Sequence, residues 1–489
     1  MNAEDRSKAD SRGRWLAFAV LSLGSFMIVL DTTIVNVALP SIREDLRFTE
    51  TSLVWVVNAY MLTFGGFLLL GGRLGDLFGH RRLFLLGVTV FTLASLACGA
   101  ASSQAMLIFA RAAQGVAGAI VSAVALSLIM DLFTEPAERA KAMGIYGFVC
   151  SAGGSVGVLL GGMLTSAFSW HWIFLVNLPI GIAVYACCRA LLPAVRSTPA
   201  GANVDVAGAV TVTTAMMLAV YAIVDGNHAG WTSVQTIGLF AGTSLLLGLF
   251  LGIEAQVRAP LVPLGLFRSR NIAAANVVGV LWAAAMFAWF FISALYLQRV
   301  LGYSALQVGL AFLPANLVMA AFSLGLSAKM VMRFGIRRPL AAGLVLAGTG
   351  LALFARAPMD ATFAVDVLPA MLLLGLGAGI AFNPMLLAAM SDVAPSDSGL
   401  ASGVVNTSFM MGGAIGLAVV ASLADATTAS AVRDGGSPVS AVNIGYHVAF
   451  AVGAALSAVA ALVGGGLVRT DPHTSARHRE RRSGALGRT

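Results

Sequence analysis

The sequence contains few charged residues for its length. Asp, Glu, Lys and Arg make up 11% of the 489 residues, whereas a soluble domain carries about a quarter. The deficit extends over long stretches of the chain, and 58% of all residues are hydrophobic. An apolar surface of this extent cannot all be buried in one water-soluble core. The composition therefore excludes a soluble globular protein and predicts an integral membrane protein.

Cysteine and histidine are scarce and poorly placed for metal or redox chemistry. The four cysteines lie in apolar segments without zinc-type spacing, and the six histidines form no pair at ligand spacing. Because no nucleophile is paired with a base either, we expect no catalytic residue, no metal and no cofactor. The formal net charge is +8, but the basic cluster lies in the tail at 477–482. We interpret it as solvated near anionic lipid, which disfavours nucleic-acid binding.

Fourteen apolar segments are long enough to cross a bilayer, which takes about 20 residues. We expect helices, because lipid-facing backbone must satisfy its own hydrogen bonds and barrel strands would alternate in polarity. The first segment exceeds the apolar core of a signal peptide and lacks a cleavage site, so we expect it to stay uncleaved. The segments are approximately 15–39, 51–71, 83–101, 104–130, 142–166, 172–192, 206–224, 235–254, 272–297, 306–328, 339–356, 364–390, 399–424 and 444–468.

The loop charges orient these segments. If the N-terminus is cytoplasmic, one of the 30 Lys and Arg, Arg111, lies inside a segment, and five lie on the outer side. The remaining 24 are then cytoplasmic, as the positive-inside rule predicts. An even number of spans places both termini on the cytoplasmic side. The five outer residues are Arg43, Arg47, Arg299, Arg356 and Arg433.

A weak internal repeat divides the chain into halves. The loops after the second and tenth segments both contain a Gly-X-Arg-Arg turn, at 79–82 and 335–338. Repeated halves with a site between them are typical of transporters. We therefore predict an N-terminal tail (1–14), an N-terminal six-helix bundle (15–195), two inserted helices (196–258), a C-terminal six-helix bundle (259–468) and a basic cytoplasmic tail (469–489).

Two ionisable residues, Asp31 and Arg111, lie well inside apolar segments. At the helical rise of 1.5 Å per residue, they lie roughly 13 Å and 10 Å from the outer ends of their segments. Side chains at matching depth could form a static salt bridge between the first and fourth segments. A proton-coupling site is the alternative that we favour, because a purely structural charge pair is costly inside a membrane.

Glycines and amides inside the segments have two interpretations each. Gly153, Gly157 and Gly161, with Gly162, place small residues on one helix face and permit close helix approach. Ordinary membrane packing explains them equally well. Amides within the spans could line a substrate cavity, or they could bridge helices by hydrogen bonds. The candidates for the cavity are Asn36, Asn58, Gln114, Asn316, Asn383 and Asn406.

Five stretches carry polar residues or glycines at fixed spacing. They are Leu30-Asp31-Thr-Thr-Ile-Val-Asn-Val-Ala-Leu-Pro40, the loop 72–82, Leu107-X-X-X-Arg111-X-X-Gln114-Gly115, Gly153-X-X-X-Gly157-X-X-X-Gly161-Gly162, and Tyr296-Leu-Gln298 with Leu301-Gly302-Tyr303-Ser304. Over nearly its whole length the chain resembles the fourteen-helix drug:proton antiporter group of the major facilitator superfamily. The departures from that group are Val158 in place of Pro, Leu77 in place of Arg, His171 in place of Arg, and Phe409-Met410 in place of Arg-Gln.

The resemblance implies roles for individual residues. It assigns Arg111 to proton coupling together with Asp31, and it identifies the glycines of the fifth segment as an antiporter motif. It also implies that Gly72, Asp76, Gly79 and Arg81 form a cytoplasmic latch between the halves, which stabilises the outward-facing state. A tight turn that keeps the topology positive inside explains the same loop without a latch.

We therefore expect an all-α integral membrane protein of the cell membrane with the major facilitator fold. It would exchange inward protons for outward hydrophobic or amphiphilic molecules, such as drugs, antibiotics, dyes or secondary metabolites, by alternating access. The expected partners are the small-molecule substrate, protons and the lipid bilayer, and we expect a monomer. An uptake symporter or uniporter on the same fold is the main alternative, and a non-transporting membrane sensor is a weaker one.

Overall fold

The computed structural model describes residues 3–133, 135–192, 205–257, 260–390 and 398–468. Within these ranges the regular structure is helical and includes no strand. The elements are α1 (Ala3–Leu46), α2 (Glu50–Phe78), α3 (His80–Gly99), α4 (Gln104–Leu132), α5 (Pro136–Ala167), α6 (Trp172–Leu175), α7 (Asn177–Leu191), α8 (Val206–Ala229), α9 (Val234–Gln256), the 3₁₀ turn η1 (Leu264–Arg268), α10 (Arg270–Arg299), α11 (Ala305–Ala321), the π-helical turn η2 (Phe322–Leu326), α12 (Ser327–Phe334), α13 (Arg337–Phe354), the π-helical turn η3 (Phe363–Val367), α14 (Leu368–Met390), α15 (Ser398–Arg433) and α16 (Pro438–Leu467).

Each of the fourteen predicted segments overlaps a described helix. In the described part of the chain, eleven helices are long and apolar enough to cross a membrane. Two shorter apolar helices, Ala152–Ala167 and Ala305–Ala321, lie among them. The prediction of an all-helical membrane protein is therefore confirmed for these residues. α1 begins at Ala3, so the helix also includes most of the predicted N-terminal tail, while the predicted C-terminal tail lies outside the described residues.

Short polar residues begin many of these helices. Their side-chain oxygens accept a hydrogen bond from a backbone N–H of the first turn, where helical donors lack partners. At α2 the cap is reciprocal, because Ser52 also bonds back to the backbone of Thr49. Residues that cap in this way are Thr49, Ser103, Asp205, Ser233, Ser269, Ser304 and Ser437.

Two predicted segments are interrupted in the structure. The segment 172–192 is divided into α6 and α7 at Val176. The segment 306–328 is divided at η2, where Gly325 has a φ of 156°. Only glycine adopts such a backbone angle without strain, because it has no Cβ. Hydropathy alone could not locate these breaks, since both interrupted stretches are predominantly apolar.

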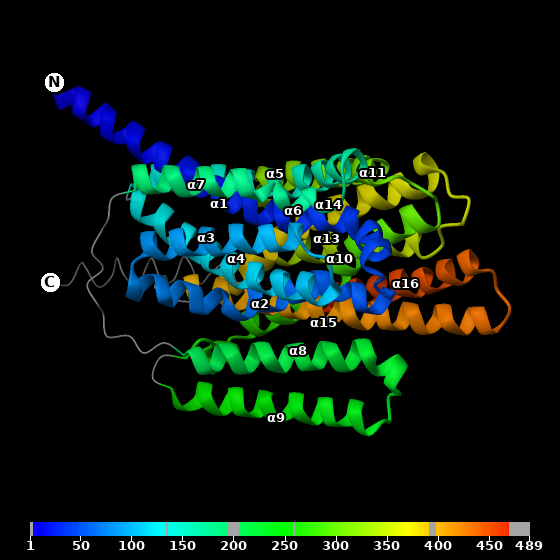
Figure 1. Cartoon of the computed structure of the whole chain (residues 1–489). Helices are drawn as coiled ribbons and strands as arrows, with labels where there is room; N and C mark the ends of the chain where they lie inside the picture. The colour runs from blue at the N-terminus through cyan, green and yellow to red at the C-terminus, as the bar shows by residue number, and fades with distance from the viewer. Residues whose placement is uncertain (1–2, 134, 193–204, 258–259, 391–397, 469–489) are drawn as a thin grey trace.

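The helices form two groups that pack side by side (Figure 1). In the first group α2 packs on α4, α1 on α5 and α3 on α4, and in the second α10 packs on α15 and α16 while α13 packs on α14. Contacts between α2 and α15 and between α5 and α11 join the groups. The predicted bundle boundaries at 195–196 and 258–259 include residues outside those that the structure describes.

The helices α8 and α9 lie outside both groups (Figure 1). α8 packs on α2 and α15, and α9 packs mainly on α8. Asn227 of α8 donates a hydrogen bond to the Ser422 carbonyl of α15 at 2.7 Å. Much of α9 is exposed, including Leu245 at 74%. Exposed apolar residues suit a helix surrounded by lipid.

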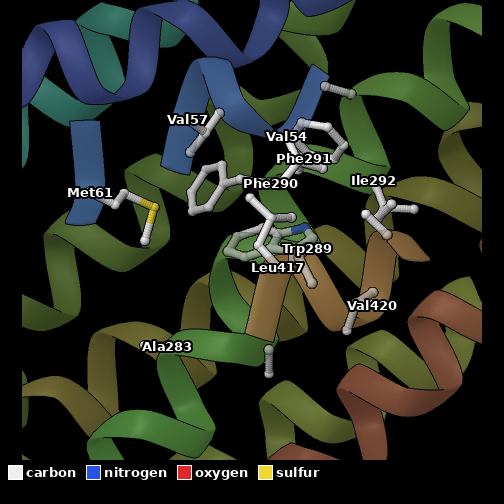
Figure 2. Packing of buried hydrophobic residues seen from close by; sticks show 14 of the residues in the cluster. Val54, Val57, Met61, Ala283, Trp289, Phe290, Phe291, Ile292, Leu417 and Val420 are labelled. Carbon is white, nitrogen blue, oxygen red and sulfur yellow. The ribbon is translucent and has the colours of Figure 1, made fainter. Parts of the chain in front are cut away.

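The buried core is continuous across the two groups. Figure 2 shows Val57 and Met61 of α2 facing Trp289 and Phe290 of α10, with Leu417 of α15 beside them. These residues belong to one cluster that extends through both groups. The groups therefore share an apolar interface rather than only touching at their rims.

Polar contacts join the groups at the end of the bundle where α1 turns into α2, which we name the Pro40 end. There Gln298 of α10 donates to the Val37 carbonyl of α1 at 2.9 Å. Arg299 of α10 forms an ion pair with Glu50 of α2. The backbone N–H of Leu306 donates to Ser166 Oγ at 3.1 Å. The two groups are thus closed against each other at this end.

Candidate functional site

Asp31 and Arg111 meet in the interior of the first helix group. Arg111 Nη1 donates to Asp31 Oδ2 at 2.5 Å, and the side chains of Arg111 and Asp31 are 1% and 0% exposed. The depth argument from the sequence placed both residues at a similar level, and the structure brings them together. Charges this deeply buried need both a counter-charge and further hydrogen bonds.

Gln114 supplies some of these further hydrogen bonds. It follows Arg111 by three residues on α4, so the two side chains lie on the same helix face. Its Oε1 accepts from Arg111 Nη1 at 2.8 Å, and its Nε2 donates to Asp31 Oδ1 at 3.1 Å. Gln114 is 0% exposed. Its amide therefore connects both members of the ion pair.

Two further residues of the site were missed by the sequence analysis. Asn177 Nδ2 of α7 donates to Asp31 Oδ1 at 2.8 Å, and Ser95 Oγ of α3 accepts from Gln114 Nε2 at 2.8 Å. Both side chains are 0% exposed. Each is a polar residue within an apolar segment, which was the signal available. Five helices, α1, α2, α3, α4 and α7, contribute hydrogen bonds to the site.

Arg111 has several contacts besides Asp31. Its Nε donates to the Val56 carbonyl of α2 at 2.9 Å. Its guanidinium lies 4.4 Å from the ring centroid of Tyr60 and 5.7 Å from that of Phe174. Aromatic faces attract a desolvated cation. The position of Arg111 is therefore fixed by a backbone carbonyl and two rings as well as by the carboxylate.

Apart from Gln114, the amides predicted to line a cavity donate to backbone carbonyls where their nitrogen is paired. Asn58 Nδ2 of α2 donates to the Ala414 carbonyl of α15 at 2.9 Å, and so joins the two groups. Asn383 Nδ2 donates to the Ser323 carbonyl at 3.3 Å. The alternative interpretation, that the amides bridge helices, describes these two residues.

The remaining cavity candidates do not gather in one place. Asn36 and Asn406 donate to carbonyls of their own helices, and Asn316 Nδ2 is buried without a hydrogen-bond partner. A groove of about 690 Å³ lies between α2, α4 and α8, and a second cavity of about 380 Å³ lies beside Arg299. None of the six amides lines either space. The substrate cavity stays a prediction.

Comparison with known proteins identifies the family. Residues 21–417 match the family described as the Major Facilitator Superfamily. The chain belongs to this superfamily. A puromycin resistance protein of Streptomyces alboniger is 39% identical over 383 residues, which are 78% of this facilitator and 76% of that protein. A cephamycin export protein of Amycolatopsis lactamdurans is 37% identical over 380 residues, which are 77% and 78% of the two chains.

A solved structure shares the facilitator fold. A bacterial homolog to the human lysosomal transporter Spinster, in an inward-facing and unoccupied conformation, aligns with a TM-score of 0.64 at 18% identity and covers 94% of this chain and 99% of that one. At this identity the likeness shows the fold alone. Together with the apolar helices, the family match makes the facilitator a multi-pass protein of the cell membrane. The resemblance to drug exporters of the superfamily is confirmed.

The glycines of α5 bring three helices of the facilitator close together. A Cβ at Gly157 would lie 2.1 Å from Thr33 Oγ1 of α1, and one at Gly161 would lie 2.6 Å from the Ile34 carbonyl oxygen. Gly162 faces α11 instead, where a Cβ would lie 2.6 Å from the Ala305 carbonyl oxygen. Gly153 also lies against α1, with a would-be Cβ at 3.2 Å from the Phe26 carbonyl oxygen. The glycine face therefore sets the distance of α1, which carries Asp31, from α5.

Arg81, in the loop of the predicted latch, makes its described hydrogen bond within the first helix group. Arg81 donates to the Arg189 carbonyl of α7 at 2.8 Å. Gly79 has a φ of 91° and separates α2 from α3, as a tight turn requires. A Cβ at Gly72 would have open space within 4 Å. The side chain of Asp76 lies outside the described residues, so the latch stays a prediction.

Proposed function

We propose that this facilitator is a proton-coupled antiporter that exports hydrophobic or amphiphilic small molecules. The observation that carries the proposal is the fully buried pair of Asp31 and Arg111 within a buried network of polar side chains. An ionisable residue inside a membrane marks an ion or proton site by default. The relatives named for puromycin resistance and cephamycin export support the direction of transport and the class of cargo.

The proposal includes the arrangement in the bilayer. Fourteen helices cross the membrane with both termini cytoplasmic, as the loop charges favour. The Pro40 end then faces outward, and the two inserted helices α8 and α9 lie against the outside of two six-helix halves. The proton is the coupling ion, the protein needs no other cofactor, and the working unit is a monomer.

Proton uptake by Asp31 is compatible with the contacts of Arg111. A proton on Asp31 removes the counter-charge and weakens the strongest contact between α1 and α4. Arg111 keeps the Val56 carbonyl, the Gln114 oxygen and the face of Tyr60. Such a cation has enough other partners to remain in place. Protonation therefore releases α1 without expelling the guanidinium from its site.

Release of α1 would reach the contacts that close the Pro40 end. α1 carries both Asp31 and Val37, whose carbonyl accepts from Gln298 of the other half. For cargo to leave on the outer side, this bond and the ion pair between Glu50 and Arg299 must separate. Alternating access then consists of breaking these contacts and forming others at the opposite end.

The interface between the halves suits an apolar or weakly charged cargo. Phe409 of α15 lies 6.0 Å from Phe287 and 6.1 Å from Phe382, measured between ring centroids. A Cβ at Gly65 of α2 would lie 3.0 Å from Met410 Cβ, so this apolar surface reaches the other half. Met and aromatic residues adapt to ligands of varied shape. With Asp31 already paired, no described buried carboxylate is free at this surface to select a highly charged cation.

The test measures proton movement driven by cargo. In everted membrane vesicles energised to an acidic interior, we expect puromycin or ethidium to cause proton release from the vesicles. Asp31→Asn should abolish that release, whereas Asp434→Asn, at an exposed carboxylate, should leave it unchanged. Flux of labelled compound without proton release would favour a uniporter. Compound and protons moving in the same direction would favour a symporter and contradict the proposal.

A further inference from the structure

The buried amide of Asn177 is only half paired. Its Nδ2 donates to Asp31 Oδ1 at 2.8 Å and lies 3.5 Å from Ser95 Oγ. Its Oδ1 is buried and has no hydrogen-bond partner, although the side chain is 0% exposed. A buried amide oxygen without a donor is costly and rare in folded proteins. This orphan atom belongs to the residue that touches the carboxylate of the proton site.

The ionised and neutral forms of Asp31 need opposite partners. As a carboxylate, Asp31 accepts from Arg111, Gln114 and Asn177. As a carboxylic acid it also carries an O–H group, which needs an acceptor. The oxygen of Gln114 already accepts from Arg111 and from Cys98 Sγ, and Ser95 Oγ donates to the Phe91 carbonyl. Asn177 Oδ1 is an acceptor beside Asp31 that has no other donor.

We propose that Asn177 is a positioning residue for the proton on Asp31. Its amide forms a hydrogen bond with Asp31 both when Asp31 is ionised and when it is protonated. Nδ2 donates to the carboxylate, and after a half-turn about the Cβ–Cγ bond Oδ1 accepts from the carboxylic acid. Either orientation leaves one amide atom without a partner, so the rest of the site prefers neither strongly. The protonation state of Asp31 then decides the orientation. This inference rests on the proposed function, because it assigns a proton cycle to Asp31.

A second unpartnered atom near the site is the competing acceptor. The hydroxyl of Tyr60 on α2 is buried without a hydrogen-bond partner, while its ring lies over Arg111. The titratable groups around Asp31 are Arg111 of α4, Tyr60 of α2 and Cys98 of α3. The helices α6 and α7 contribute Phe174 and Asn177, which do not titrate. Of the two acceptors, Asn177 is the one already in contact with the carboxylate.

Infrared difference spectroscopy on the full chain in lipid, recorded between acid and alkaline pH, tests this directly. The C=O stretch of a protonated carboxyl group is assigned to Asp31 by its loss in Asp31→Asn. In Asn177→Leu we expect this band at higher wavenumber, because the O–H group has lost its acceptor. We also expect the pH midpoint of the band to rise by about one unit, because a charge-assisted donor to the carboxylate is stronger than a neutral acceptor.

Three further variants separate this role from a structural one. Asn177→Thr keeps a group that donates and accepts, so it should restore both readings. Asn276→Leu is the matched control, because Asn276 of α10 is also a buried amide with a paired nitrogen and an unpartnered oxygen, and it lies outside the helix group that contains Asp31. It should change neither reading. Asn177→Ala is a smaller replacement, for use if the Leu variant does not fold. It should give the same changes in wavenumber and midpoint that we expect for Asn177→Leu.

Several outcomes would overturn the inference. An Asp31 band that keeps its wavenumber and midpoint in both Asn177→Leu and Asn177→Ala would exclude the amide. A shift in Tyr60→Phe with none in Asn177→Leu would transfer the role to the tyrosine. Absence of any Asp31 band would remove the inference together with the proton site. A band that shifts as expected while Asp31→Asn still exports with proton release would contradict Asp31 as the coupling site and leave proton antiport itself standing.

Discussion

The two helix groups bury different kinds of side chain. The first group encloses Asp31 and Arg111 with Gln114, Asn177 and Ser95, whereas the buried polar residues described in α10–α16 are all uncharged. Both groups bury large aromatic side chains, but those of the second group, including Trp282 and Trp289, lie in a core without a described buried charge. Two groups of similar helical design therefore differ in chemistry. The difference suggests that one half responds to protons while the other presents an apolar surface.

The largest effect expected from this difference follows from removing the cation of the first group. Arg111→Leu leaves an unpaired carboxylate in the interior, which we expect to destabilise the fold by about 3–5 kcal/mol at neutral pH. At acid pH the loss should shrink, because a protonated Asp31 needs no counter-charge. Thermal unfolding in detergent at several pH values measures both. An equal loss at every pH would show that Asp31 does not titrate in the folded protein.

A smaller effect is expected at the contact between α1 and α5. Gly157→Ala places a Cβ against Thr33 and the Leu30 carbonyl, and should cost about 1–3 kcal/mol through overpacking. It should also lower cargo-driven proton release, because α1 carries Asp31. Gly238→Ala on α9 has open space around the new atom and serves as the control. Unchanged proton release in Gly157→Ala would separate the glycine face from coupling.

The ion pair at the Pro40 end should have a still smaller effect on stability. Glu50→Gln removes a partly exposed pair with Arg299, worth about 1 kcal/mol, and should shift the halves toward the form open at that end. Distances between spin labels placed on either half at this end would report the shift. The exchanged pair Glu50→Arg with Arg299→Glu should restore closure. A distance distribution that is unchanged in Glu50→Gln would assign the closure to Gln298 and the apolar interface.

The smallest effect is expected on the outermost helix. Leu245 of α9 is 74% exposed and would face lipid, so Leu245→Ala should change stability by no more than about 0.5 kcal/mol. Lipid tails replace the lost methyl contacts at little cost. Chemical unfolding in lipid or mild detergent checks this. A loss of several kcal/mol would instead indicate that a second molecule packs on α9.

Much of this architecture follows from hydropathy, and the pair at the centre follows from helix geometry. Because the helical rise is fixed, residue number gives depth, and depth sufficed to bring Asp31 and Arg111 together. Asn177 and Ser95 could not be found in the same way. Uncharged polar residues occur in membrane helices for several reasons. Only the packing of α7 on α1 brings Asn177 to the carboxylate, and only the packing of α3 on α4 brings Ser95 to Gln114. The break at Gly325 likewise depends on a backbone angle that composition does not reveal.

The hairpin of α8 and α9 has a consequence for traffic from the bilayer. α8 contacts α2 and α15, which belong to different halves, so it lies across the seam between them. The opposite seam, between α5 and α11, is tightly packed at Gly162 and Gly309, because these residues have no side chain to hold the two backbones apart. A molecule dissolved in the membrane would therefore meet an extra pair of helices on one flank and a tightly packed seam on the other. We expect entry from lipid to differ between the two flanks.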